Sequence, residues 1–100
     1  MATTWIDEHD EVWIDEDGLL HKGRAWVALP DGEWRLMEPL VEHMGELVRR
    51  DALTQAGWPG RQVAASALNV RIKKARKRLE ALGLKITTVR GRGYVLAADI

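Results

Sequence analysis

The chain has 100 residues, 46% of them hydrophobic, and its 15 basic and 15 acidic side chains cancel to a formal net charge of zero. That length allows one hydrophobic core, and because the first residues are acidic and no long apolar run follows, we expect neither a signal peptide nor a membrane span. The sequence has no cysteine, which excludes disulfides, thiolate nucleophiles and cysteine-based zinc sites.

The net charge of zero hides a division along the chain. Residues 1–60 carry five Lys or Arg against thirteen Asp or Glu, a charge of −8, whereas residues 61–100 carry ten against two, a charge of +8. Such asymmetry is typical of a chain whose basic part binds a polyanion. The alternative, charges scattered for solubility, would leave both parts near neutrality.

Short apolar runs separated by turn residues predict antiparallel strands in residues 11–30. The runs are EVWID, LLHKG and RAWVALP, with the turn EDG between the first two. Residues 1–10 form an N-terminal arm in this interpretation. The tetrapeptide WIDE occurs at 5–8 and again at 13–16, which indicates similar acidic strand ends and not a repeat architecture.

A three-helix core is predicted for residues 31–82. Apolar residues recur at steps of three and four after Asp31, which can cap a first helix, and Gly45 stands where a left-handed residue would close it. Pro39 lies inside this helix and predicts a kink or a late start, because proline removes a backbone hydrogen bond.

Two further helices follow. The second is predicted for residues 50–56 and ends at Gly57, and the third spans about residues 63–82 and stops at Gly83. One apolar stripe runs along the third helix: Leu68, Ile72, Ala75, Leu79 and Leu82.

The C-terminal part alternates between apolar and polar residues again. Residues 84–97 predict a β-hairpin whose turn, Gly91-Arg92-Gly93, carries arginine. Since no linker separates the acidic strands from the basic end, we expect residues 1–100 to form a single α+β domain.

The third helix contains the run RIKKARKRL at 71–79. Cations at this density suit the phosphates on both sides of a DNA major groove, which admits one helix, and the arginines of the hairpin tip suit a minor groove. Asn69 is able to pair with adenine, and Val70 to touch a thymine methyl group. We expect the helix to expose all six basic side chains: Arg71, Lys73, Lys74, Arg76, Lys77 and Arg78.

A solvated helix face is the alternative interpretation of this basic run, and a turn without function is the alternative for the hairpin tip. A membrane-bound helix is disfavoured, because the apolar stripe lacks the large aromatic side chains that insert into the interface.

Several motifs together resemble the C-terminal effector domain of OmpR/PhoB-type response regulators, over about residues 11–97. They are EWRLME at 33–38, VRRDAL at 48–53, Trp58, NVRIKKARKRL at 69–79 and TVRGRGY at 88–94. The resemblance implies an α+β fold, a winged helix-turn-helix with an N-terminal four-stranded antiparallel β-sheet, three helices and a C-terminal β-hairpin wing.

The resemblance also implies a function: a sequence-specific, double-stranded DNA-binding transcriptional regulator of bacterial or phage origin. Its recognition helix would lie in the major groove and its wing in the minor groove, with Trp58 bracing the backbone. The DNA-facing positions would be Asn69, Val70, Arg71, Lys73, Lys74 and Arg76 in the helix, and Thr88, Arg90, Arg92 and Tyr94 in the wing.

The sequence departs from the family in several places. We expect no receiver domain before this one, and we therefore expect that control by phosphorylation does not carry over. The loop that touches RNA polymerase in the family is short here, at residues 59–62, Arg49 replaces the usual serine cap of the second helix, and Ala67 replaces a larger polar residue.

The expected partners are double-stranded DNA, RNA polymerase and a second copy of the chain, as a tandem dimer on direct repeats. The alternative is a winged-helix protein-interaction module that docks on RNA polymerase or on another regulator.

No catalytic residue, cofactor or metal site is predicted. His9, His21 and His43 lie on different elements, and the acidic stretch 7–11 lacks a recognised ligand spacing, so it is interpreted as solvated. We expect a protein that is not an enzyme and that works in the cytoplasm at the nucleoid, away from membranes.

Overall fold

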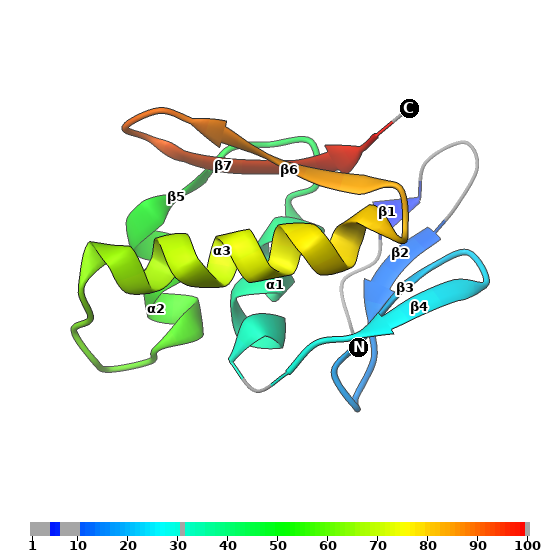
Figure 1. The fold of residues 1–100 in the computed structure, drawn as a ribbon, viewed down its shortest axis with the longest axis horizontal. Helices are drawn as coiled ribbons and strands as arrows, with labels where there is room; N and C mark the ends of the chain where they lie inside the picture. Colours follow the sequence, from blue (N-terminus) through cyan, green and yellow to red (C-terminus); the bar gives the residue numbers. More distant parts are fainter. Residues whose placement is uncertain (1–4, 7–10, 31, 100) are drawn as a thin grey trace.

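Two antiparallel sheets and three helices make up the computed structural model, which describes residues 5–6, 11–30 and 32–99 (Figure 1). The strands are β1 (Trp5–Ile6), β2 (Glu11–Ile14), β3 (Leu19–Lys22), β4 (Ala25–Ala28), β5 (Val48–Arg49), β6 (Leu84–Val89) and β7 (Gly93–Ala98). The helices are α1 (Glu33–Glu42), α2 (Arg50–Gly57) and α3 (Ala65–Glu80).

The N-terminal strands form a four-stranded sheet in the order β1-β2-β3-β4. Because side chains alternate along a strand, Val12, Ile14 and Leu20 are buried in the core, while Trp13 and His21 stack on the other face with ring centroids 4.5 Å apart. The meander expected in residues 11–30 is confirmed. The stretch interpreted as an arm contributes β1, and its residues 1–4 and 7–10 lie outside the described part of the chain.

Helix α1 runs from Glu33 through Pro39, so the expectation of a late start is wrong, and the kink stays a prediction. A proline inside a helix costs about 3 kcal/mol. Burial offsets this cost, because each large apolar side chain removed from water contributes about 1.5–3 kcal/mol. The buried apolar residues of α1 are Leu36, Met37, Leu40 and Val41.

The two ends of α1 differ from expectation in detail. The cap position before α1 is Gly32, and the predicted cap, Asp31, lies outside the described residues. The helix ends at Glu42, and Gly45 has the predicted positive φ, +84°. The Gly45 amide donates a hydrogen bond to the Leu96 carbonyl at 2.8 Å, which joins the end of α1 to the C-terminal sheet.

Helices α2 and α3 lie where the sequence predicts them. Arg49 occupies the cap position of α2, and its side chain makes no cap hydrogen bond within the described structure. Helix α3 begins and ends two residues inside the predicted bounds of 63 and 82. The predicted stripe is confirmed, because its members are all at most 5% exposed: Leu68, Ile72, Ala75, Leu79 and Leu82.

The C-terminal wing is a hairpin of β6 and β7, paired from Leu84↔Ala98 to Val89↔Gly93. Strand β5 adds a third strand to this sheet by pairing with β7, in the order β5-β7-β6. The sequence did not predict β5, because two residues are too few to show an alternating pattern.

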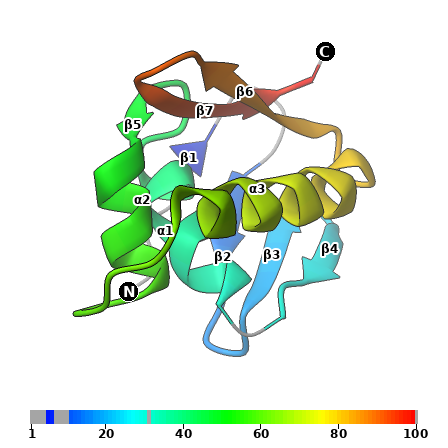
Figure 2. The same cartoon turned by 60° about the vertical axis from the view of Figure 1, so that its left-hand side comes forward.

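Helix α3 lies between the two sheets, with the wing on one side and the N-terminal strands on the other (Figures 1 and 2). One core of buried apolar side chains draws on both sheets and all three helices. The predicted α+β winged helix-turn-helix fold is thereby confirmed.

Candidate nucleic-acid interface

Helix α3 presents three different sides around its buried stripe. At about 100° per residue, Val70, Lys73, Lys74 and Lys77 fall on the side opposite the stripe, and all four are exposed. The expectation that all six basic side chains of 71–79 are exposed is wrong for the three arginines of α3, which are partly buried. The reason is that each arginine contacts a neighbouring element.

On the flank of α3 that faces the wing, Arg76 contacts strand β6. Its Nε donates a hydrogen bond to the Ile86 carbonyl at 2.9 Å, and its Nη2 donates one to Thr88 Oγ1. Hydrogen bonds from a charged donor are stronger than neutral ones. The sequence predicts both Arg76 and Thr88 as site residues, and the structure shows that they bind each other and hold β6 against the helix.

A polar cluster of Arg50, Asn69 and Tyr94 joins the starts of α2 and α3 to strand β7. Arg50 Nη1 donates to the Tyr94 hydroxyl at 2.8 Å, and Nη2 donates to Asn69 Oδ1 at 3.0 Å. The Tyr94 hydroxyl in turn donates to Asn69 Oδ1 at 3.2 Å. Both lone pairs of the Asn69 carbonyl oxygen therefore have a donor, and the NH₂ group of this exposed side chain is left to bind a partner.

The opposite flank of α3 faces α1 and the loop after α2. Arg78 Nε lies 2.8 Å from Glu33 Oε2, and the Glu33 side chain is only 5% exposed. The Arg71 guanidinium lies over the Trp58 ring, 4.5 Å from its centroid. Arg71 and Trp58 were both expected at the DNA, and the structure places them together on this flank, away from the exposed lysines.

The wing tip projects two arginines. Arg90 and Arg92 are exposed on either side of Gly91, which has a φ of +74°. The Arg92 amide closes the turn on the Val89 carbonyl at 2.9 Å. The tip is therefore a short cationic loop at the end of the hairpin that Arg76 anchors.

Within the described part of the chain, no group of three or more His, Cys, Asp or Glu side chains is placed to hold a metal ion. The acidic stretch 7–11 falls outside that part except for Glu11. No described helix has the length and apolar character needed to cross a membrane.

Residues 23–96 match the family described as "Transcriptional regulatory protein, C terminal". The chain belongs to this family. Its members are the OmpR/PhoB-type DNA-binding domains of transcription regulators, and the domain is not a catalytic one.

The relatives of this OmpR/PhoB-type domain are response regulators. The chain is 31% identical over 83 residues to the sensory transduction protein BceR of Bacillus subtilis (strain 168), a match that covers 80% of this chain and 36% of that protein. The chain spans about a third of the length of the curated relatives it matches.

Two solved structures show the same arrangement. The C-terminal domain of the nisin resistance regulator NsrR, a lantibiotic response regulator, has a TM-score of 0.72 and 29% identity over 85% of this chain and 89% of that one. The RstA DNA-binding domain of Klebsiella pneumoniae, in complex with the RstA box, has a TM-score of 0.69 and 27% identity over 94% of this chain and 96% of that one.

One residue of this OmpR/PhoB-type interface, Arg50, was missed from the sequence. It opens α2, 19 positions before Asn69 and 44 before Tyr94. The only local signal is the pair Arg49-Arg50 at the start of a predicted helix. The contacts that give Arg50 its role exist only once α2, α3 and the wing have packed together.

Proposed function

We propose that this sequence-specific DNA-binding domain of a transcription regulator places the exposed side of α3 in the major groove of double-stranded DNA and the wing tip in the adjacent minor groove. The observation that carries the proposal is the exposed row on α3, Val70, Lys73, Lys74 and Lys77, beside the projecting tip. Lysines of this row reach phosphates, and Lys74 and Val70 reach base edges.

The polar cluster changes the role proposed for Asn69. Pairing with adenine needs an amide that donates and accepts at once. Since Arg50 and Tyr94 both donate to Asn69 Oδ1, this side chain has only its NH₂ group to offer. We therefore propose that the Asn69 NH₂ group donates a hydrogen bond to the DNA, either to a phosphate oxygen or to an acceptor atom of a base.

In the proposed function, four of the predicted site residues orient other side chains and do not contact the DNA themselves. Tyr94 is 4% exposed and its hydroxyl both accepts from Arg50 and donates to Asn69, so it orients these two side chains. Arg76 holds Thr88 and the wing, while Arg71 and Trp58 hold each other on the flank toward α1. Thr88 keeps a hydroxyl hydrogen with which to bind a phosphate, and Arg90 and Arg92 enter the minor groove.

The domain would also have protein partners and a defined location in the cell. Two copies would bind direct repeats in tandem, and the short loop at residues 59–62 would offer a surface to RNA polymerase. The domain would work in the cytoplasm, at the nucleoid. A protein-interaction module, the alternative, would bind without the steep loss of affinity with salt that counterion release from DNA produces.

The substitution Lys74→Ala tests the direct role of α3. We expect it to weaken binding to the preferred duplex by about 1–3 kcal/mol and to weaken binding to random duplex less, because a base contact is lost only on the preferred site. Fluorescence anisotropy of labelled duplexes measures both affinities. Lys85→Ala is the control, since Lys85 is the second residue of β6, at the end of the wing away from the tip. Equal losses on both duplexes would rule out direct readout by Lys74.

A further inference from the structure

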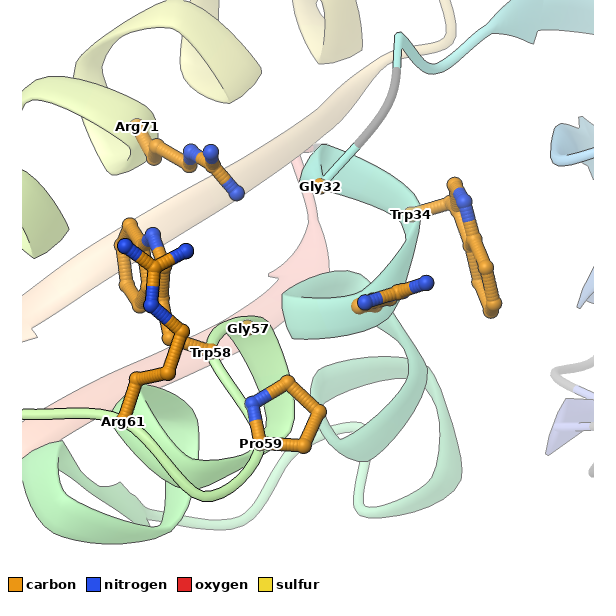
Figure 3. A pocket seen from close by; sticks show the side chains of 8 residues that line it. Gly32, Trp34, Gly57, Trp58, Pro59, Arg61 and Arg71 are labelled. Atoms are coloured by element: carbon orange, nitrogen blue, oxygen red, sulfur yellow. The ribbon is translucent and has the colours of Figure 1, made fainter.

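An arginine-lined pocket opens on the flank of α3 that faces α1. It has a volume of about 620 Å³ and lies between the start of α1, the loop after α2 and the middle of α3 (Figure 3). Three of its side chains are arginines, Arg35, Arg61 and Arg71, and none of the described residues that line it is acidic. The described lining therefore carries a formal charge of +3 with no carboxylate to balance it.

Arg71 is partly buried, whereas the other two arginines of this pocket are exposed. Figure 3 shows its side chain reaching from α3 toward Gly32 and Trp58. The Trp58 ring supports the guanidinium from one side at 4.5 Å. Its Nη1 is buried and has no hydrogen-bond partner in the described structure. A buried charged donor without an acceptor is unfavourable, and an anion bound at the other guanidinium nitrogens would offset its charge.

The backbone of α1 leaves room for this arrangement only because residue 32 is a glycine. A Cβ atom on Gly32 would lie 1.9 Å from Arg71 Nη1. Gly32 also has a φ of +90°, a conformation that residues with a side chain rarely adopt. The close approach of Arg71 to α1 therefore depends on the absence of a side chain at this position.

The pocket does not face the groove proposed for DNA. Around the α3 axis, Arg71 lies about 100° from Val70 and about 60° from Lys74, toward the α1 side. Arg35 belongs to α1 and Arg61 to the loop after α2, and both line the pocket together with Arg71. The exposed lysines thus form one cationic surface and the three arginines form another.

We propose that this pocket binds a small-molecule anion of about nucleotide size, through a phosphoryl or carboxylate group held by Arg35, Arg61 and Arg71. The planar guanidinium fork matches both kinds of oxyanion in a bidentate way. Pockets of about 300–1,000 Å³ suit small molecules, and this one lies in that range. The indole of Trp58 provides a flat apolar wall for the remainder of the ligand.

Nuclear magnetic resonance of the full chain tests this site with two probes, inorganic phosphate and adenosine monophosphate, titrated at constant ionic strength. We expect saturable shifts at the Gly32 amide, the Trp58 indole and the Arg71 Nε–H, with smaller shifts at the amides of Lys73 and Lys74. Both Arg71→Gln and Arg61→Gln should weaken binding by about tenfold or more, because each removes a charged donor. Arg61 is exposed, so its substitution leaves the fold intact.

Lys74→Gln is the matched control, because it removes one positive charge from the other surface of α3. It should leave the affinity for adenosine monophosphate unchanged and weaken duplex binding, whereas Arg61→Gln should do the reverse. This pair separates failure of the pocket from failure of the DNA-binding proposal.

Three results would overturn the proposal. Shifts that grow without saturation and spread over the lysines would mean unspecific attraction of anions. Saturable binding that Arg61→Gln and Arg71→Gln leave unchanged would place the anion elsewhere. Loss of duplex affinity in Arg61→Gln, without binding of either probe, would assign the arginines to a phosphate of the DNA backbone.

Discussion

Asp15 shows how one side chain stabilises the turn between β2 and β3. Its Oδ1 accepts hydrogen bonds from the amides of Asp17 and Leu19 at 2.9 and 3.0 Å, and its Oδ2 lies 2.7 Å from His21 Nε2. The hydrogen bond from His21, followed by that from the Leu19 amide, lowers the pKa of Asp15 below its usual value of 3.8. The ionised form is therefore the one that the fold favours.

The pH dependence of stability follows from the sign of that shift. Because the pKa is lower in the folded than in the unfolded state, Asp15 contributes stability that is complete above about pH 4–5 and is lost as the pH falls through the folded pKa. Asp15→Asn keeps an oxygen for the turn but cannot ionise, so we expect it to be less stable than the unsubstituted protein near neutral pH. This difference in unfolding free energy between the two proteins should shrink below about pH 4.

Urea unfolding of both proteins between pH 2 and pH 6 measures this deficit. His21→Gln serves as the control, because it removes the largest cause of the shift and should move the transition toward the usual pKa of Asp15. A deficit that stays constant down to pH 2 would contradict the assignment.

At the scale of elements, the pair Glu33–Arg78 joins the start of α1 to the end of α3. Glu33 is the only charged residue that is buried among the described residues, at 4% exposure, and Arg78 Nε lies 2.8 Å from its carboxylate. Removal of one partner from a buried pair leaves an uncompensated charge, which costs about 3–5 kcal/mol. Arg78 is 39% exposed, so solvent screening reduces the cost here.

We expect Arg78→Leu to lower the free energy of unfolding by about 2–3 kcal/mol, since it strands the Glu33 carboxylate. Adding Glu33→Gln should restore part of this loss, because the residue left behind is then neutral. A double-mutant cycle by urea unfolding measures the coupling. Additive losses would show that the two side chains do not stabilise each other.

Strand β5 depends on a glycine in its partner. A Cβ atom on Gly93 would lie 2.0 Å from the Val48 carbonyl oxygen, in the pairing between β5 and β7. We expect Gly93→Ala to destabilise the protein by about 1–3 kcal/mol through this overlap. Gly91→Asn is the control: no atom lies within 4 Å of its Cβ position, and asparagine tolerates a positive φ. Equal melting temperatures for the two variants would contradict this account.

Elements with a periodic sequence pattern could be predicted, whereas contacts between elements could not. The stripe of α3 and the alternation of the wing are periodic, so the sequence alone predicts these elements and their buried faces. The partners of Arg71, Arg76 and Arg78 lie on other elements, and nothing local distinguishes these arginines from the neighbouring lysines. The role of Arg50 and the pairing of β5 are likewise set by tertiary packing.

At the scale of the whole molecule, the basic part of the sequence coincides with the elements proposed to bind DNA, α3 and the wing. The exposed lysines of α3 and the wing arginines lie together in the basic part of the chain, and the acidic residues are concentrated before residue 60. If the charges of Lys73, Lys74, Lys77, Arg90 and Arg92 each release about one counterion from the DNA, the logarithm of the affinity should fall against the logarithm of the salt concentration with a slope of about −4 to −5. Replacing one of these lysines or arginines with alanine should make that slope less steep by about one unit.

The central claim is that this domain reads a DNA sequence with α3 and its wing. The most direct measurement is selection of binding sites from a pool of randomised duplexes at two salt concentrations, followed by sequencing of the retained DNA. The account predicts salt-sensitive retention and a recovered motif, with direct repeats spaced by about one helical turn. Retention that yields no motif, or no retention at either salt concentration, would contradict it.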